Sequence, residues 1–127
     1  MTSSEQTWSL NQVIAHNVRR LRRDAKYTQP ELAALMEAAG LHWNEHTVSH
    51  AELAFRDPDR GRRFTVEELV ALAVPLGTTP LLLMLPPDGV RIRVGNTGLA
   101  REGFFASVFG GKEWRRPEPR REITKAV

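Results

Sequence analysis

Residues 27–52, YTQPELAALMEAAGLHWNEHTVSHAE, decide the fold because they contain two helix starts separated by an unusual connection. Thr28 is followed three residues later by Glu31, which is the pattern of a capping box at a helix N-terminus. Apolar residues recur at helical spacing after it, and Gly40 is a natural C-terminal stop. This pattern predicts a helix that extends to about Ala39.

A second helix is expected over residues 44–53. Asn44 is a favourable N-cap, although we do not expect Thr47 to complete a capping box with it. Val48 and Ala51 give this short helix an apolar, inward-facing side.

Three further helix starts flank this stretch. Ser9 with Gln12 and Thr65 with Glu68 repeat the capping-box pattern, and a proline at the first helical position follows Thr79. In four of the five starts, an aromatic residue precedes the cap and an aliphatic residue lies four positions after it, as in a hydrophobic staple. The expected fold class is all-α: a five-helix domain over residues 9–86, with no strand pattern before Val90.

The composition excludes several classes of protein. The chain has 127 residues and no cysteine, so disulfides and thiolate zinc sites are ruled out. The start of the sequence lacks the basic region and apolar run of a signal peptide, and no apolar run reaches membrane-spanning length. We therefore expect a cytoplasmic protein without membrane contact.

The charge is unevenly distributed along the chain. Residues 1–86 contain 9 basic and 10 acidic side chains, whereas residues 87–127 contain 9 and 5. Two local basic clusters, RRLRRDAK (19–26) and RDPDRGRR (56–63), could contact nucleic acid or could simply be solvated.

The C-terminal extension, residues 87–127, is expected to contain one short strand and one helix. VRIRV (90–94) alternates like an exposed edge strand, and GNTG (95–98) is a turn. A helix over 98–110 should place four apolar side chains on one face, either packed on the core of the domain or forming a dimer seam: Phe104, Phe105, Val108 and Phe109. Residues 111–127 have charge and proline but little apolar content, which predicts a mobile tail.

Several elements in order, YTQPELAALM, TVSHAE and TVEELVALAVPLGTTPLLLM, resemble the helix-turn-helix transcription regulators of the lambda-repressor/Cro type, also called the xenobiotic-response-element family. The connection before Asn44 is about five residues longer than this family's usual spacing, which resembles a long-turn variant associated with actinobacteria. The resemblance implies that helix 44–53 is the recognition helix, which enters the major groove.

The resemblance also implies roles for individual residues. Glu45, His46 and His50 would face the bases. Backbone contacts would come from the first residue of the preceding helix, from the recognition helix and from the loop after it: Gln29, Thr47, Ser49, Arg56, Arg60, Arg62 and Arg63. Glu52 would have a structural role, holding the motif together by bonding backbone or an arginine.

The string HWNEH (42–46) matches the zinc-peptidase pattern H-x-x-E-H. That pattern requires both histidines on one helical face, but His42 precedes the helix that starts at Asn44. We therefore expect no metal, no cofactor and no catalytic residue, and a metal-dependent enzyme using His42, Glu45 and His46 is a remote alternative.

The hypothesis from the sequence is a sequence-specific regulator of transcription, a repressor that binds double-stranded DNA as a homodimer. The alternative is an antitoxin-like or adaptor protein that acts mainly through a protein partner, bound by the C-terminal extension.

Overall fold

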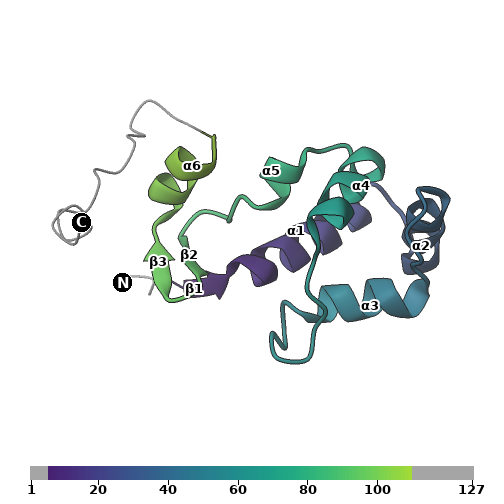
Figure 1. Cartoon of the computed structure of the whole chain (residues 1–127), viewed down its shortest axis with the longest axis horizontal. Helices are drawn as coiled ribbons and strands as arrows, with labels where there is room; N and C mark the ends of the chain where they lie inside the picture. The colour runs from purple at the N-terminus through teal and green to yellow at the C-terminus, as the bar shows by residue number, and fades with distance from the viewer. Residues whose placement is uncertain (1–5, 110–127) are drawn as a thin grey trace, which may run out of the picture.

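Helix α1 (Leu10–Asp24) runs through the middle of the molecule in the computed structural model, which describes residues 6–109 (Figure 1). Four further helices surround it: α2 (Gln29–Ala38), α3 (Glu45–Leu53), α4 (Val66–Leu76) and α5 (Pro80–Leu83). The remaining elements are β1 (Gln6–Ser9), β2 (Val90–Val94), β3 (Thr97–Leu99) and α6 (Arg101–Phe109). No helix in this part of the chain is long and apolar enough to span a membrane.

The first five helices begin at the caps that the sequence predicts. Each cap side chain accepts a hydrogen bond from a backbone N–H in the first turn: Ser9, Thr28, Asn44, Thr65 and Thr79. At Asn44 the capping box is complete, because Thr47 Oγ1 accepts from the Asn44 N–H at 3.2 Å. The expectation that Thr47 cannot complete it was wrong, since a hydroxyl oxygen accepts here as a carboxylate would.

The expected all-α fold class was wrong, because a three-stranded mixed sheet is part of the fold. β2 is the central strand, paired in parallel with β1 and antiparallel with β3. Trp8 lies opposite Ile92 in the first pairing, and Ile92 lies opposite Leu99 in the second. The strand predicted at 90–94 is therefore present, but it is not an exposed edge strand.

The sequence did not predict the sheet, because the contacts that stabilise it are non-local. β1 has only four residues and pairs with a strand more than eighty positions later in the chain, so neither periodicity nor local turn chemistry reveals it. This pairing joins the start of the predicted helical domain to the segment that the sequence assigned to a C-terminal extension.

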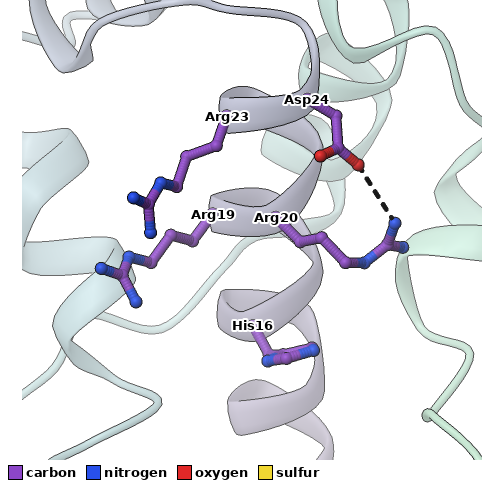
Figure 2. A pocket seen from close by; sticks show the side chains of 5 residues that line it. All are labelled: His16, Arg19, Arg20, Arg23 and Asp24. Atoms are coloured by element: carbon purple, nitrogen blue, oxygen red, sulfur yellow. Dashed lines mark ion pairs between the residues drawn. The ribbon is translucent and has the colours of Figure 1, made fainter.

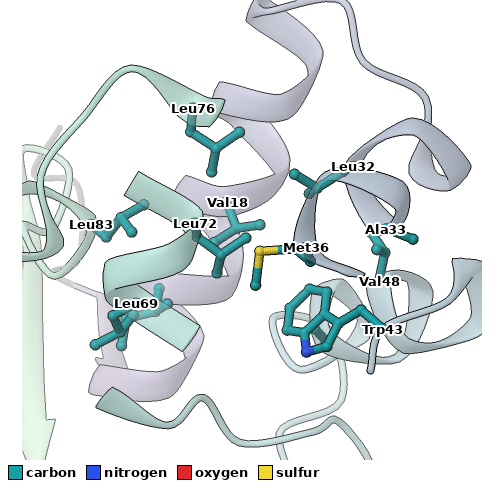
Figure 3. Close-up of a cluster of buried hydrophobic side chains, with 12 residues drawn as sticks. Val18, Leu32, Ala33, Met36, Trp43, Val48, Leu69, Leu72, Leu76 and Leu83 are labelled. Carbon is teal, nitrogen blue, oxygen red and sulfur yellow. The ribbon is translucent and has the colours of Figure 1, made fainter. Parts of the chain in front are cut away.

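The main hydrophobic core lies between α1, α2, α3 and α4. Figure 3 shows Met36 and Trp43 facing Leu72 of α4, with Val18 of α1 behind them. Trp43, in the connection before α3, is only 4% exposed. The long α2–α3 connection is therefore anchored by one large aromatic side chain that fills the space between α3 and α4.

A second core lies under the sheet and contains Val13, Ile92 and Phe104. Val108 packs at its margin, whereas Phe105 is 40% exposed, so the predicted single apolar face of this helix is divided. Phe104 and Val108 therefore serve the protein's own core, which was one of the two alternatives. The side chain of Phe109 and the predicted tail at 111–127 lie outside the described residues.

Amide side chains of α1 hold the loops in place by hydrogen bonds to their backbone. Asn11 donates to Arg62 O and accepts from the Phe64 N–H, and Gln12 donates to Phe55 O. Asn17, which is 3% exposed, donates to the carbonyls of Leu83 and Leu85. These bonds satisfy backbone groups that would otherwise be buried without partners.

We predict that the sheet is required for stability. Ile92→Ala should lower the free energy of unfolding by about 2–5 kcal/mol, because it leaves a cavity beneath β2. Val94→Ala, in the same strand but 43% exposed, is the matched control and should cost much less. Chemical denaturation of both variants measures the difference, and equal losses would contradict the assignment of β2 to the core.

Candidate nucleic-acid interface

Helix α3 presents a polar face to solvent and an apolar face to the core. Glu45, His46 and His50 are exposed, whereas Val48 and Ala51 are fully buried. The rings of His46 and His50 stack at a centroid distance of 5.6 Å. The side chains that the sequence assigns to base contacts are thus together on one accessible surface.

His42 lies in the connection before α3 and not on the helix. The prediction that the H-x-x-E-H string does not form one helical face is confirmed. Within residues 6–109, no group of three or more metal-ligating side chains is close enough to hold an ion.

A buried ion pair fixes one edge of α3. Glu52 accepts from Arg22 Nε at 2.6 Å and from Arg22 Nη2 at 3.0 Å, so the contact with α1 is bidentate. Gln29, the first residue of α2, donates to Glu52 Oε1 at 3.2 Å. One carboxylate therefore joins α1, α2 and α3, which confirms the structural role predicted for Glu52.

A second buried carboxylate, Glu68 of α4, binds the segments on either side of α3. It accepts from Trp43 Nε1 at 3.0 Å and from Arg62, whose guanidinium lies 5.4 Å from the centre of the Trp43 ring. Glu68 is 4% exposed and also caps its own helix through the Thr65 N–H. The segment before α3 and the loop after it are therefore both tied to α4.

The ion pair with Glu68 changes the interpretation of Arg62. The sequence predicted that Arg62 contacts the DNA backbone, but its guanidinium is already paired with Glu68 and lies near the Trp43 ring. Sequence reasoning could not separate Arg62 from Arg63, because adjacent arginines in a loop carry no periodicity.

The loop that carries the other nominated arginines packs directly on the end of α3. A Cβ at Gly61 would lie 2.1 Å from Ala54 Cα, so only glycine fits at this position. Arg60 makes a loose pair with Asp57 at 3.8 Å. Arg56 and Arg63 are exposed and have no carboxylate partner among the residues that the structure describes.

The remaining nominated residues lie near a hollow beside the C-terminal half of α3. Gln29 and Ser49 line it, together with side chains from α1 and from the end of α3: Arg19, Glu52, Leu53, Phe55 and Arg56. Thr47 is half-buried and engaged in the Asn44 cap. Within residues 6–109, one side-chain N–H of Gln29 and its backbone N–H at the start of α2 have no hydrogen-bond partner.

The solvent face of α1 carries a basic cluster. The sequence indicated this cluster but not which of its arginines are exposed. His16, Arg19, Arg20, Arg23 and Asp24 line a shallow hollow there (Figure 2). Helical periodicity could have shown which arginine is buried, because Arg22 lies four residues after buried Val18 and therefore on the same, inward side of α1.

His16 belongs to a cluster of three rings at the edge of this face. Its ring centre lies 5.1 Å from Trp8 and 5.2 Å from Phe55, and those two rings meet edge to face at 4.8 Å. Burial lowers the pKa of His16, and the nearby charges of Arg20 and Arg19 lower it further. The folded protein therefore favours the neutral imidazole.

Comparisons with protein-family models, with curated proteins and with solved structures gave no match for this chain.

We predict that the Arg22–Glu52 pair is required as a pair. Glu52→Ala should cost about 3–5 kcal/mol, because it leaves a guanidinium buried without its partner. The double variant Arg22→Met/Glu52→Leu should regain most of this loss, since both charges are removed together.

Asp24→Ala is the control for the Arg22–Glu52 experiment, because it breaks an exposed pair with Arg20 and should cost less than about 1 kcal/mol. Denaturant titrations of these variants test the claim. A double variant as unstable as Glu52→Ala would contradict the prediction, because it would show that the loss does not come from an unpaired buried guanidinium.

We predict a pH dependence of stability from His16. Because its folded-state pKa is lowered, the unfolded chain takes up the proton first as pH falls. The contribution of His16 is therefore complete above its unfolded pKa of about 6.5 and is lost as pH falls through the folded pKa.

The test of the His16 prediction is the melting temperature of the wild type and of His16→Phe, which keeps a ring but cannot titrate. The wild type should lose more stability than the variant between about pH 7 and pH 5. Carboxylates common to both proteins cancel in the difference, and parallel curves would remove His16 as the cause.

Proposed function

We propose that this protein binds double-stranded DNA in a sequence-specific manner and regulates transcription, with α3 as the recognition helix in the major groove. The observation that carries the proposal is the exposed face formed by Glu45, His46 and His50 on a short helix in a fixed position. Its own buried carboxylate binds α1 and α2, and a buried carboxylate of α4 binds the segments on either side of it. Precise placement of a short helix is what recognition of base edges requires.

The side chains on this face are suited to base edges. Glu45 can accept a hydrogen bond from the exocyclic amine of cytosine, and a histidine N–H can donate to guanine oxygen or nitrogen. The negative charge of Glu45 requires compensation near DNA. The exposed arginines of the flanking loop, Arg56 and Arg63 foremost, are available for phosphate contacts.

A homodimer remains part of this proposal, because one recognition helix contacts only a half-site. A repressor role also remains a proposal that rests on the family resemblance. Selection of bound sequences from a random DNA pool tests binding and symmetry together. A palindromic consensus supports a dimer, a single non-repeated site supports a monomer, and no enrichment would overturn DNA recognition.

A protein-binding adaptor is the second candidate, and one observation favours it. Val66, Val70 and Val74 follow one another at four-residue spacing on α4 and are 77%, 55% and 82% exposed. β-branched residues are unfavourable on a solvated helix surface, so this stripe is suited to a protein partner. Indifference of function to changes on α3 would favour this candidate.

We predict that changes on α3 alter base preference. Glu45→Ala and His50→Ala should each change the preferred base at particular positions, at a cost of about 1–3 kcal/mol per half-site. Arg63→Ala should instead weaken all sequences about equally. Arg62→Ala is unsuitable for this comparison, because it also breaks the ion pair with Glu68.

The measurement is a binding profile over all single-base variants of the selected site. Wild type, Glu45→Ala, His50→Ala and Arg63→Ala are compared at one salt concentration. If the Glu45→Ala and His50→Ala profiles are only scaled copies of the wild-type profile, α3 does not contact the bases.

A further inference from the structure

The solvent face of α1 separates its arginines into two groups. Figure 2 shows Arg20 directed to one side of the helix, where it pairs with Asp24 at 3.6 Å, and Arg19 and Arg23 directed together to the other side. Neither Arg19 nor Arg23 has an acidic partner within residues 6–109. Two positive side chains four residues apart repel each other on a helix, so this arrangement costs stability in the absence of an anion.

The position of Arg23 has a local explanation, whereas that of Arg19 does not. Arg23 lies in the last turn of α1, where a positive charge is favourable to the helix dipole. Arg19 lies more than a turn further from that end. Its charge is also not balanced by Glu52 nearby, because that carboxylate is already bound by Arg22.

Arg19 connects the α1 face to the edge of the recognition helix. It lines the hollow on α1 with His16 and Arg23, and it also lines the hollow that contains Gln29, Ser49 and Arg56. A basic line therefore runs from Arg23 through Arg19 to Arg56, beginning on α1 and ending just after α3. A four-residue step along a helix spans about 6 Å, so the two guanidiniums on α1 can reach neighbouring phosphates of one strand.

We propose that Arg19 and Arg23, together with Arg56, bind the phosphodiester backbone of duplex DNA next to the segment that α3 contacts. This inference rests on the proposed function and extends the DNA-binding surface from α3 onto α1. The contact is independent of base sequence, because guanidinium groups on phosphates hold the duplex in register without distinguishing bases. It also makes the bound duplex longer than the base-contacting segment alone.

Adjacent residues provide a charge-matched test. Arg19→Gln and Arg20→Gln each remove one positive charge, but from opposite sides of α1. Affinities of the full chain for the selected duplex are measured by fluorescence anisotropy from about 50 to 200 mM salt. Arg19→Gln should lower the salt slope by about 0.9 and Arg19→Gln/Arg23→Gln by about twice that, whereas Arg20→Gln should leave it near the wild-type value.

Over this salt range the double variant should lose about tenfold less affinity than the wild type, since two fewer counterions are released. Its base preference should be unchanged. A duplex shortened to the base-contacting segment should bind wild type and double variant equally. Melting temperatures close to or above that of the wild type verify that the substitutions leave the fold intact, since removal of the Arg19–Arg23 repulsion should not destabilise it.

Four outcomes would overturn the inference. Equal slopes for Arg19→Gln and Arg20→Gln would show that only net charge matters. A changed base preference in the double variant would make α1 a base-contacting element. Duplex binding with a wild-type slope in the double variant would leave the proposed function standing without the α1 contact, whereas failure of the wild type to bind any duplex would overturn both.

Discussion

The arrangement of the helices depends on the buried pairing of Glu52 with Arg22. A buried carboxylate is tolerable only when its oxygens are satisfied, and here the acceptors are shared between a guanidinium from α1 and the amide of Gln29 from α2. The pairing thus sets the position of α3 against two other helices.

Glu68 has a related task in the segments that flank α3. It binds Trp43 before the helix and Arg62 after it, and Gly61 lets the intervening loop lie directly against the end of α3. Two glutamates are therefore the fixed points of the candidate site: Glu52, whose structural role the sequence predicted, and Glu68, which the sequence predicted only as part of a capping box. Their partners, Arg22 and Arg62, are removed from the set of arginines that could contact a ligand.

What could be predicted from the sequence was local. A cap at Thr28 or Thr65 depends on residues within one turn, so five helix starts were predictable, and the inward side of α3 followed from Val48 and Ala51. The sheet depended on a pairing between Trp8 and Ile92 across the whole domain, and no local pattern encodes it. The different positions of Arg22 and Arg19 were predictable only in part. Helical periodicity indicates that Arg22 lies on the inward side of α1, but it does not indicate which buried residue pairs with its charge.

A nearly neutral segment can still carry a locally basic surface, because its unpaired charges are not spread evenly. Residues 1–86 have one more acidic than basic side chain. Glu52 and Glu68, however, are buried, and Asp24 and Asp57 pair with Arg20 and Arg60 at the surface. The potential outside the protein is set by the charges that remain exposed and unpaired, and on the side of α1 that borders α3 these are arginines. Net charge is therefore a poor guide to the partner of this domain, because each ion pair removes one acid and one base and the exposed charges that remain are unevenly placed over its surface.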